Sequence, residues 1–429
     1  MDETVSRKVL WRLVPFLMLC YFAAFLDRVN VGFAALTMNR DLGLSAAVYG
    51  LGAGIFVLGY FLFEVPSNII LEKVGARRWI ARIMITWSLV SGCTAFVAGE
   101  WSFYLVRFLL GVAEAGFFPG IIFYLTNWFP SEQRGKVVGT FMMAIPISSI
   151  IGSPLSAWIM AATDGSHGLA GWQWLYLIEA APSFLLGFAV LAYLTDRPEE
   201  ARWLAPEERR WLSERIARDR REKVEVRKIS LAQALVHPRV LGLSLVYFGI
   251  STGLYGIGLW LPQIVREFGL STLQTGFVTA IPYAVSAVGM VLWTRHSDAK
   301  MERTWHVALP AVVGGLALAA AGYAPSPALS MAALSLAALG VFCAMPTFWT
   351  LPTALLTGSA AAGGIALINS IGGLGGFVGP YMIGWIKDAT GQFGLALLAI
   401  AGFMVAAGLL TLVVGSVRPA LRDKPSPAE

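Results

Sequence analysis

Residues 63–82 read FEVPSNIILEKVGARRWIAR and join two apolar runs, at residues 47–71 and 79–98. Each run is long enough to cross about 30 Å of hydrocarbon as a helix, which takes about 20 apolar residues. The loop between them is short. The loop holds one acid, one glycine and three basic residues: Glu72, Lys73, Gly75, Arg77 and Arg78. The stretch therefore predicts a pair of neighbouring transmembrane helices joined by a basic loop.

The rest of the chain repeats this pattern. Of its 429 residues, 57% are hydrophobic and only 14% are charged, whereas soluble domains carry about 25% charged residues. This composition excludes an ordinary soluble enzyme, a disordered chain and a disulfide scaffold. Twelve apolar runs are long enough to span a membrane: 9–38, 47–71, 79–98, 102–127, 136–162, 173–194, 239–265, 273–294, 305–323, 328–356, 362–386 and 393–416. We expect an all-α integral membrane protein.

Lysine and arginine are concentrated in the loops on one side of these runs, and such loops face the cytoplasm. The loops on the other side hold only Arg40, Arg266 and Lys387. Both termini lie on the basic side and are expected in the cytoplasm. The first run has no small-residue cleavage site after a short apolar core, so we interpret it as a retained helix. These features predict a multi-pass protein of the inner (plasma) membrane, and the net charge of +6 does not indicate a nucleic-acid partner.

A basic segment, residues 195–238, separates residues 1–194 from residues 239–429, and each part holds six runs. Duplicated halves are the common plan of secondary transporters, whose substrate site lies between the halves near the middle of the membrane. Within the segment we predict a linker with an amphipathic helix on the membrane face. A partner-binding surface is the alternative. Its apolar side would be Trp203, Leu204, Trp211, Leu212 and Ile216.

The loop after the eighth run repeats the charged pattern of residues 72–78 in a weaker form. It carries Asp298, Lys300 and Arg303 at the corresponding point of the second half. An acid at a helix end that faces clustered cations of the other half can form an ion pair in one state and lose it in the next. We therefore predict that the two loops act as gating loops.

Two of the runs each hold an acid and an arginine: Asp27 and Arg28 lie in the first, and Arg107 and Glu114 lie in the fourth. A charge at bilayer depth costs at least about 2.5–3.5 kcal/mol, so it usually faces a cavity and has a partner. Adjacent helical residues point about 100° apart, so one of Asp27 and Arg28 can face a cavity while the other faces a neighbouring helix. Static ion pairs between the two helices are one interpretation, although hydrophobic replacements usually stabilise as well or better.

The functional interpretation gives these charges a task in moving an anion. Arg28 would hold a substrate carboxylate, because guanidinium binds two oxygens at once and stays charged. Glu114 would carry a proton, because a carboxyl in a site of low dielectric is readily protonated once no arginine pairs with it. Protonation would free Arg28 for the incoming carboxylate, and the two halves would then rock to open the site on the other side.

The loop Glu72-Lys73-x-Gly75-x-Arg77-Arg78 resembles the signature loop of the major facilitator superfamily, with Glu72 where Asp is usual. Five further strings resemble the anion:cation symporter family within it: FLDRVNVGFA (25–34), FEVPSN (63–68), RFLLGVAEAGFFPG (107–120), GWQWLYLIEA (171–180) and GIALINSIGGLGGFVGP (364–380). The resemblance implies twelve helices in two pseudo-symmetric six-helix halves. It also implies a carrier of organic carboxylates, driven by protons or sodium.

The resemblance also implies roles for particular residues. Asp27 and Glu114 match acids linked to proton coupling, Arg28 matches the anion-binding arginine, and Arg107 matches an arginine that partners them. Three further residues match substrate contacts of the family: Tyr60, Trp349 and Asn369.

Two departures from the family pattern bear on the substrate. Phe25 stands where a tyrosine is usual, and no glutamine is evident near Ile145 and Pro146. Both favour a substrate with fewer hydroxyls than a sugar acid, such as an aromatic or short aliphatic carboxylate.

Other functions fit the sequence less well. A proton-coupled drug or amphiphile antiporter of the same fold remains the alternative, although Arg28 argues against it. An enzyme would need catalytic groups, and no nucleophile, cofactor or metal-ligand spacing is found. A sensor would need an output domain larger than the linker. We therefore expect a monomeric symporter, whose partners are a small organic acid, a proton (or sodium) and the lipid bilayer.

Overall fold

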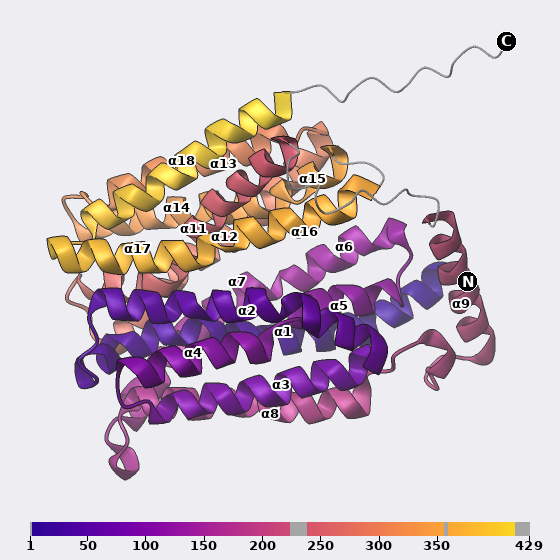
Figure 1. Cartoon of the computed structure of the whole chain (residues 1–429), viewed down its shortest axis with the longest axis horizontal. Helices are drawn as coiled ribbons and strands as arrows, with labels where there is room; N and C mark the ends of the chain where they lie inside the picture. The colour runs from indigo at the N-terminus through magenta and orange to yellow at the C-terminus, as the bar shows by residue number, and fades with distance from the viewer. Residues whose placement is uncertain (1, 224–237, 356–358, 417–429) are drawn as a thin grey trace.

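The computed structural model describes residues 2–223, 238–355 and 359–416. In these residues the chain forms helices that run side by side in two groups (Figure 1). The first group comprises α1 (Asp2–Asp41), α2 (Ala46–Val74), α3 (Ala76–Cys93), α4 (Glu100–Glu114), α5 (Phe117–Thr126), α6 (Ser131–Met142), α7 (Ala144–Thr163) and α8 (Gly171–Tyr193). The second comprises α11 (Pro238–Arg266), α12 (Thr272–Lys300), α13 (Thr304–Ala321), α14 (Pro327–Phe348), α15 (Thr350–Leu355), α16 (Ser359–Gly373), α17 (Gly375–Thr390) and α18 (Gly394–Ser416).

Helices dominate because a bilayer offers no water to backbone N–H and C=O groups, and a helix satisfies them internally. In the described ranges, eleven helical stretches are long and apolar enough to cross a membrane. The remaining predicted span, the eleventh (362–386), is occupied by α16 and α17 end to end. The all-α prediction is confirmed, and the short break at Tyr323–Pro327 does separate α13 from α14, where Ser326 caps the helix by accepting a hydrogen bond from the Leu329 N–H.

Four predicted spans are interrupted, which the sequence analysis did not anticipate. The fourth breaks after Glu114, between α4 and α5, where Gly116 adopts φ 86°. The others break at Met143, Trp349 and Leu374. At the first break, the Ser67 hydroxyl donates to the Ala115 carbonyl at 2.6 Å. Interrupted helices in transporters lie where they line a cavity, because the freed backbone groups need partners there.

The linker helix α9 (Pro206–Lys223) packs on the first group of helices. Trp203 stacks on Trp128 with ring centroids 5.5 Å apart, and three other apolar side chains of the segment are buried: Leu204, Leu212 and Ile216. Three ion pairs surround this contact: Lys8–Glu208 at 2.9 Å, Arg134–Asp219 at 3.0 Å and Arg215–Glu132 at 3.0 Å. The predicted apolar side therefore covers protein, which corrects the expectation that it covers the membrane surface.

We call the end of the molecule that carries the start of α1 together with α9 the basic end (Figure 1). At the opposite end the two groups of helices touch closely along α2 and α17. A Cβ added to Gly50 would lie 2.3 Å from the Pro380 carbonyl oxygen, and one on Gly384 would lie 2.1 Å from that of Ala46. Small residues permit such close backbone approach between membrane helices.

Polar contacts reinforce this junction at the opposite end. The Asp388 carboxylate accepts hydrogen bonds from the first N–H groups of α2, at 3.0 Å from Ala46 and 2.7 Å from Ala47. An anion is stabilised at a helix N-terminus by these N–H groups and by the helix dipole. The Tyr49 hydroxyl also donates to the Leu259 carbonyl at 2.8 Å. The two groups of helices are therefore closed against each other at this end.

We predict that Gly50→Leu will push α2 and α17 apart at the opposite end, because overpacking a tight contact costs about 1–3 kcal/mol. Spin labels at Arg40 and Gln392, in a variant without native cysteines, should report a longer distance between the two groups of helices. Gly402→Leu is the control, since a Cβ there would meet no atom within 4 Å. An unchanged distance in Gly50→Leu would show that this contact does not hold the end closed.

Candidate functional site

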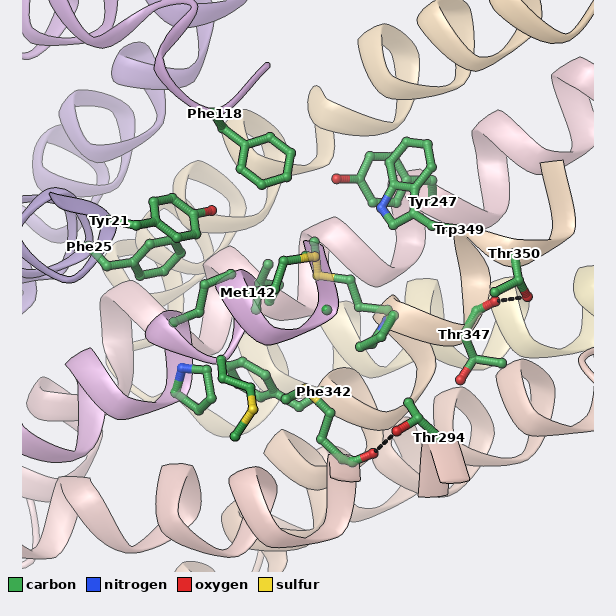
Figure 2. Close-up of a pocket in the computed structure, with 18 of the residues that line it drawn as sticks. Tyr21, Phe25, Phe118, Met142, Tyr247, Thr294, Phe342, Thr347, Trp349 and Thr350 are labelled. Carbon is green, nitrogen blue, oxygen red and sulfur yellow. Dashed lines mark hydrogen bonds between the residues drawn. The ribbon is translucent and has the colours of Figure 1, made fainter. Parts of the chain in front are cut away.

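A cavity of about 660 Å³ lies between the two groups of helices and is lined by both (Figure 2). Pockets for small molecules usually have volumes of about 300–1,000 Å³. Most of the side chains in the close-up are aromatic rings and methionines: Tyr21, Phe25, Phe118 and Met142 from the first group, and Tyr247, Phe342 and Trp349 from the second (Figure 2). The cavity also reaches Arg295, Asp298 and Arg303, so it extends towards the basic end.

Arg28 lies in the wall of this cavity, on α1. Its guanidinium carbon lies near three rings, with distances to the centroids of 5.2 Å for Phe25, 5.3 Å for Phe56 and 5.7 Å for Tyr60. A cation is attracted to the faces of aromatic rings, more strongly where water is excluded. The guanidinium also forms a hydrogen-bonded ion pair with Glu114.

Glu114 is the last residue of α4, directly before the break, and its side chain is 3% exposed against 12% for Arg28. It does not line the cavity, so the carboxylate lies behind the arginine. Because Glu114 approaches from one side only, an anion in the cavity could reach the same guanidinium from the other. This arrangement allows one carboxylate to take the place of another.

Asp27 points away from the cavity, into the packing of α1 against α3 and α8. Its carboxylate accepts three hydrogen bonds, at 3.0 Å from the Trp87 indole, 3.0 Å from the Ser91 hydroxyl and 2.7 Å from the Ser183 hydroxyl. No cation forms an ion pair with it among the described residues. Its role in proton coupling stays a prediction, and its visible contacts join three helices.

Arg107 is 1% exposed and points from α4 towards α2. One of its terminal nitrogens donates to the Ala53 carbonyl at 3.5 Å, and the ring of Phe56 lies 5.1 Å from its guanidinium carbon. Its other guanidinium nitrogens have no partner among the described residues. Arg107 therefore does not pair with Glu114 here, and the ring of Phe56 lies near both Arg28 and Arg107.

The structure brings the other predicted substrate contacts to the cavity as well. Tyr60, Trp349 and Asn369 all line it, together with Glu64. Trp349 occupies the break between α14 and α15 and stands edge-on to Tyr247, with ring centroids 4.8 Å apart. The Asn369 amide donates to Glu64 Oε1 at 3.3 Å, which joins α16 to α2 across the cavity.

The two predicted gating loops are each tied within their own half. In the first, Gly75 has φ 96°, and the Arg77 N–H donates to Asp196 at the end of α8, at 2.8 Å. The side chains of Glu72, Lys73 and Arg78 are exposed. In the second, Asp298 pairs with Arg303 at 2.6 Å, and Lys300 is exposed. No ion pair joins the two loops in the described part of the chain.

One cluster near the second loop was missed by the sequence analysis. His296 Nδ1 lies 2.8 Å from His306 Nε2, and His306 Nδ1 lies 2.6 Å from the Glu302 carboxylate. Burial raises the pKa of Glu302, but hydrogen bonds from the Trp305 and His306 N–H groups and from the His306 ring outweigh it, so the pKa is lowered. The ten-residue spacing that spans the turn between α12 and α13 was the available signal. Within the described ranges, no group of three or more His, Cys, Asp or Glu side chains could hold a metal ion.

The sequence model of the Major Facilitator Superfamily matches residues 17–380. The chain belongs to this superfamily, so it is a membrane transporter and not an enzyme, as its motifs predicted. It is 55% identical over 429 residues to a "Putative tartrate transporter" of Agrobacterium vitis, which covers 100% of this chain and 99% of that protein. It is 42% identical to a "Quinolone resistance transporter" of Acinetobacter baumannii, over 96% of this chain and 95% of the relative.

Among solved structures, the chain is similar to a bacterial homolog of the human lysosomal transporter Spinster, in an inward-facing and unoccupied conformation. The TM-score is 0.76 at 19% sequence identity, and the match covers 99% of each chain. This likeness confirms the predicted major facilitator fold.

We predict that Asp27→Asn will lower the melting temperature of the purified protein. An amide presents one acceptor oxygen to donors that now share a carboxylate, and a buried donor left without its acceptor costs about 1–3 kcal/mol. A thermal-shift measurement in detergent tests this, with the exposed Glu207→Gln as the matched control. Ser183→Ala removes one of the three donors and should cause a smaller loss. Equal melting of Asp27→Asn and wild type would contradict the anchoring role.

Proposed function

We propose that this protein is a secondary transporter that imports an organic carboxylate together with protons, by alternating access. The observation that supports it best is the position of Arg28, a permanent cation in the wall of a mid-molecule cavity. Among the described residues it forms an ion pair with Glu114, which lies behind it. An isolated cation at this depth would be costly. An incoming carboxylate could replace Glu114 with little change in the electrostatics of the guanidinium.

The charges of the pair set the coupling. Arg28 and Glu114 together are neutral when the site is empty. If a carboxylate bound without a proton, the site would carry one unpaired negative charge in a low-dielectric region, which is unfavourable. If Glu114 were protonated without a bound carboxylate, Arg28 would be left unpaired. Only joint binding of the proton and the carboxylate, or of neither, keeps the site neutral, and this condition couples the two.

The cycle follows from this condition. With the site facing outwards, Glu114 takes a proton and releases Arg28, which then binds the substrate carboxylate. The neutral site allows the two six-helix halves, residues 1–194 and 239–429, to rock. The junction of Gly50, Gly384 and Asp388 closes the outer end, while the gating loops separate at the basic end. The substrate leaves to the cytoplasm, and the proton follows.

The location proposed is the inner (plasma) membrane, with the basic end and both termini in the cytoplasm, because basic loops are retained there. A monomer suffices for this mechanism, since both halves of the site come from one chain. Sodium in place of the proton is the alternative coupling ion.

The relatives support the substrate class. One at 55% identity is named for tartrate, an organic acid. The aromatic lining of the cavity also suits a carboxylate with an aromatic or short aliphatic body, because planar rings pack favourably against the rings present there. A substrate rich in hydroxyls would leave more of its polar groups unpaired against this wall.

A second candidate function is proton-coupled efflux of drugs or amphiphiles. The observation that favours it is the 42% identity to a protein named for quinolone resistance, together with the large aromatic cavity. Proteoliposomes that hold a pH-sensitive dye separate the two functions. Acidification of the lumen on external addition of carboxylates supports symport, whereas proton efflux against cationic drugs, with no response to any carboxylate, would support the antiporter.

We predict that Glu114→Gln will abolish pH-driven accumulation of a carboxylate in proteoliposomes while retaining exchange of labelled for unlabelled substrate, because the glutamine cannot carry a proton. Arg28→Lys should lower the apparent affinity for the carboxylate by about tenfold or more, since a hydrogen bond to a charged group contributes about 1.5–3 kcal/mol. The exposed Glu207→Gln is again the control. Accumulation by Glu114→Gln at the wild-type rate would remove Glu114 from the mechanism.

A further inference from the structure

Glu64 is a carboxyl in the cavity that the proposed mechanism does not use. It lies on α2 and lines the cavity with Val57 and Tyr60, which stand seven and four residues before it and so share its helix face. Among the described residues, its side chain is hydrogen-bonded to the Asn369 amide, at 3.3 Å. No cation of the described residues forms an ion pair with it.

The remaining hydrogen-bonding capacity of Glu64 faces the cavity. An ionised carboxylate offers about four lone-pair sites, and Asn369 occupies one of them. Neither side-chain oxygen of Glu64 is among the buried atoms without a partner, so the free capacity is not sealed inside the protein. A group that enters the cavity can therefore donate to this carboxylate.

Tyr60 connects Glu64 to the anion site. The Tyr60 ring lies 5.7 Å from the guanidinium carbon of Arg28, and Glu64 follows one helical turn further along α2, a rise of about 6 Å. The cavity wall thus carries a cation near the Tyr60 ring and an acid one helical turn beyond Tyr60 on α2. Aromatic side chains of both halves line the cavity, among them Phe118 of the first half and Tyr247 and Trp349 of the second (Figure 2). A planar substrate body would lie between these rings.

We propose that Glu64 is a specificity-determining residue that accepts a hydrogen bond from a donor group, an ammonium or a hydroxyl, at the end of the substrate remote from its carboxylate. This inference rests on the proposed function, in which Arg28 holds that carboxylate. The favoured substrate is then a carboxylate with a planar body and a donor at its far end. For a substrate long enough to span from Arg28 to Glu64, a second carboxylate in contact with Glu64 is disfavoured, because like charges repel and an ionised acid has no proton to donate.

The contact with Asn369 adds a consequence for the two halves. Glu64 belongs to residues 1–194 and Asn369 to residues 239–429, so a substrate donor that displaces the Asn369 amide breaks a hydrogen bond between the halves. Recognition of the far end of the substrate therefore acts on a contact that must change when the halves rock.

A series of four acids with one ring tests the proposal: benzoate, 4-hydroxybenzoate, 4-(aminomethyl)benzoate and terephthalate. Their half-saturation concentrations are measured by competition for uptake in proteoliposomes. In wild type, 4-(aminomethyl)benzoate should bind about tenfold more tightly than benzoate, because a charge-assisted hydrogen bond is among the stronger ones, and 4-hydroxybenzoate should lie between them. Terephthalate should bind more weakly than benzoate.

In Glu64→Gln the half-saturation concentration of benzoate divided by that of 4-(aminomethyl)benzoate should fall from about ten to about one. Terephthalate should bind more tightly, relative to benzoate, than it does in wild type. Ratios within one variant cancel any general loss of activity. Glu64→Asp should keep part of the ammonium preference, and the exposed Glu200→Gln should keep all of it. If Glu64→Gln does not fold, the order of the half-saturation concentrations of the four acids in wild type still tests the proposal.

Three results would overturn the inference in distinguishable ways. Equal ratios in wild type and Glu64→Gln would remove Glu64 from substrate selection while leaving carboxylate transport in place. Unchanged ratios with loss of proton-driven benzoate uptake would make Glu64 a proton carrier instead. No response to any of the four acids, or to tartrate, would contradict the proposed function itself and the inference with it.

Discussion

The ion pair of Arg28 and Glu114 is the interaction on which the rest of the site depends. A guanidinium in the middle of an apolar bundle needs an anion, and Glu114 supplies one from the last residue of α4. The helix breaks directly after that residue, and Phe25, Phe56 and Tyr60 surround the cation with rings. The break and the rings leave one side of the guanidinium open to the cavity, where a second anion can compete for it.

The two acids near Arg28 differ in what holds them. Asp27 accepts three hydrogen bonds from fixed donors on α3 and α8, so its carboxylate is satisfied without any cation. Glu114 is instead paired with a cation, Arg28, that also lines the cavity. An acid with fixed donors stabilises the packing of helices, whereas an acid with an exchangeable partner can change its protonation during a cycle. The adjacent residues Asp27 and Arg28 therefore have different surroundings: Asp27 lies in the packing of α1 against α3 and α8, and Arg28 lies in the cavity wall.

Much of the fold could be predicted from the sequence, because span length and the distribution of lysine and arginine are governed by the thickness and the charge asymmetry of the membrane. The position of Arg28 at a cavity also follows from the cost of an unpaired charge. The partner of Arg28 could not be predicted, since Glu114 and Arg107 share α4 and only the rotation of the helices decides that Arg107 faces Ala53. The helix breaks at Met143, Trp349 and Leu374 could not be recognised from hydropathy, because they lie inside continuous apolar runs.

The packing of α9 and the contact between His296 and His306 could not be predicted from the sequence, for a similar reason. An amphipathic segment shows that one side is apolar, but it does not show whether protein or lipid covers that side. Here Trp128 of the first half covers Trp203. Two histidines ten residues apart become neighbours only through the turn between α12 and α13, where Met301 adopts φ 51°.

The exchange of carboxylates at Arg28 is tested most directly by counting protons when a ligand binds. Titration calorimetry of benzoate binding to the purified protein, in two buffers with different ionisation enthalpies, gives the number of protons taken up. The account predicts uptake of about one proton per ligand in wild type at neutral pH and about none in Glu114→Gln. Uptake that is absent in wild type, or that persists unchanged in Glu114→Gln, would contradict it.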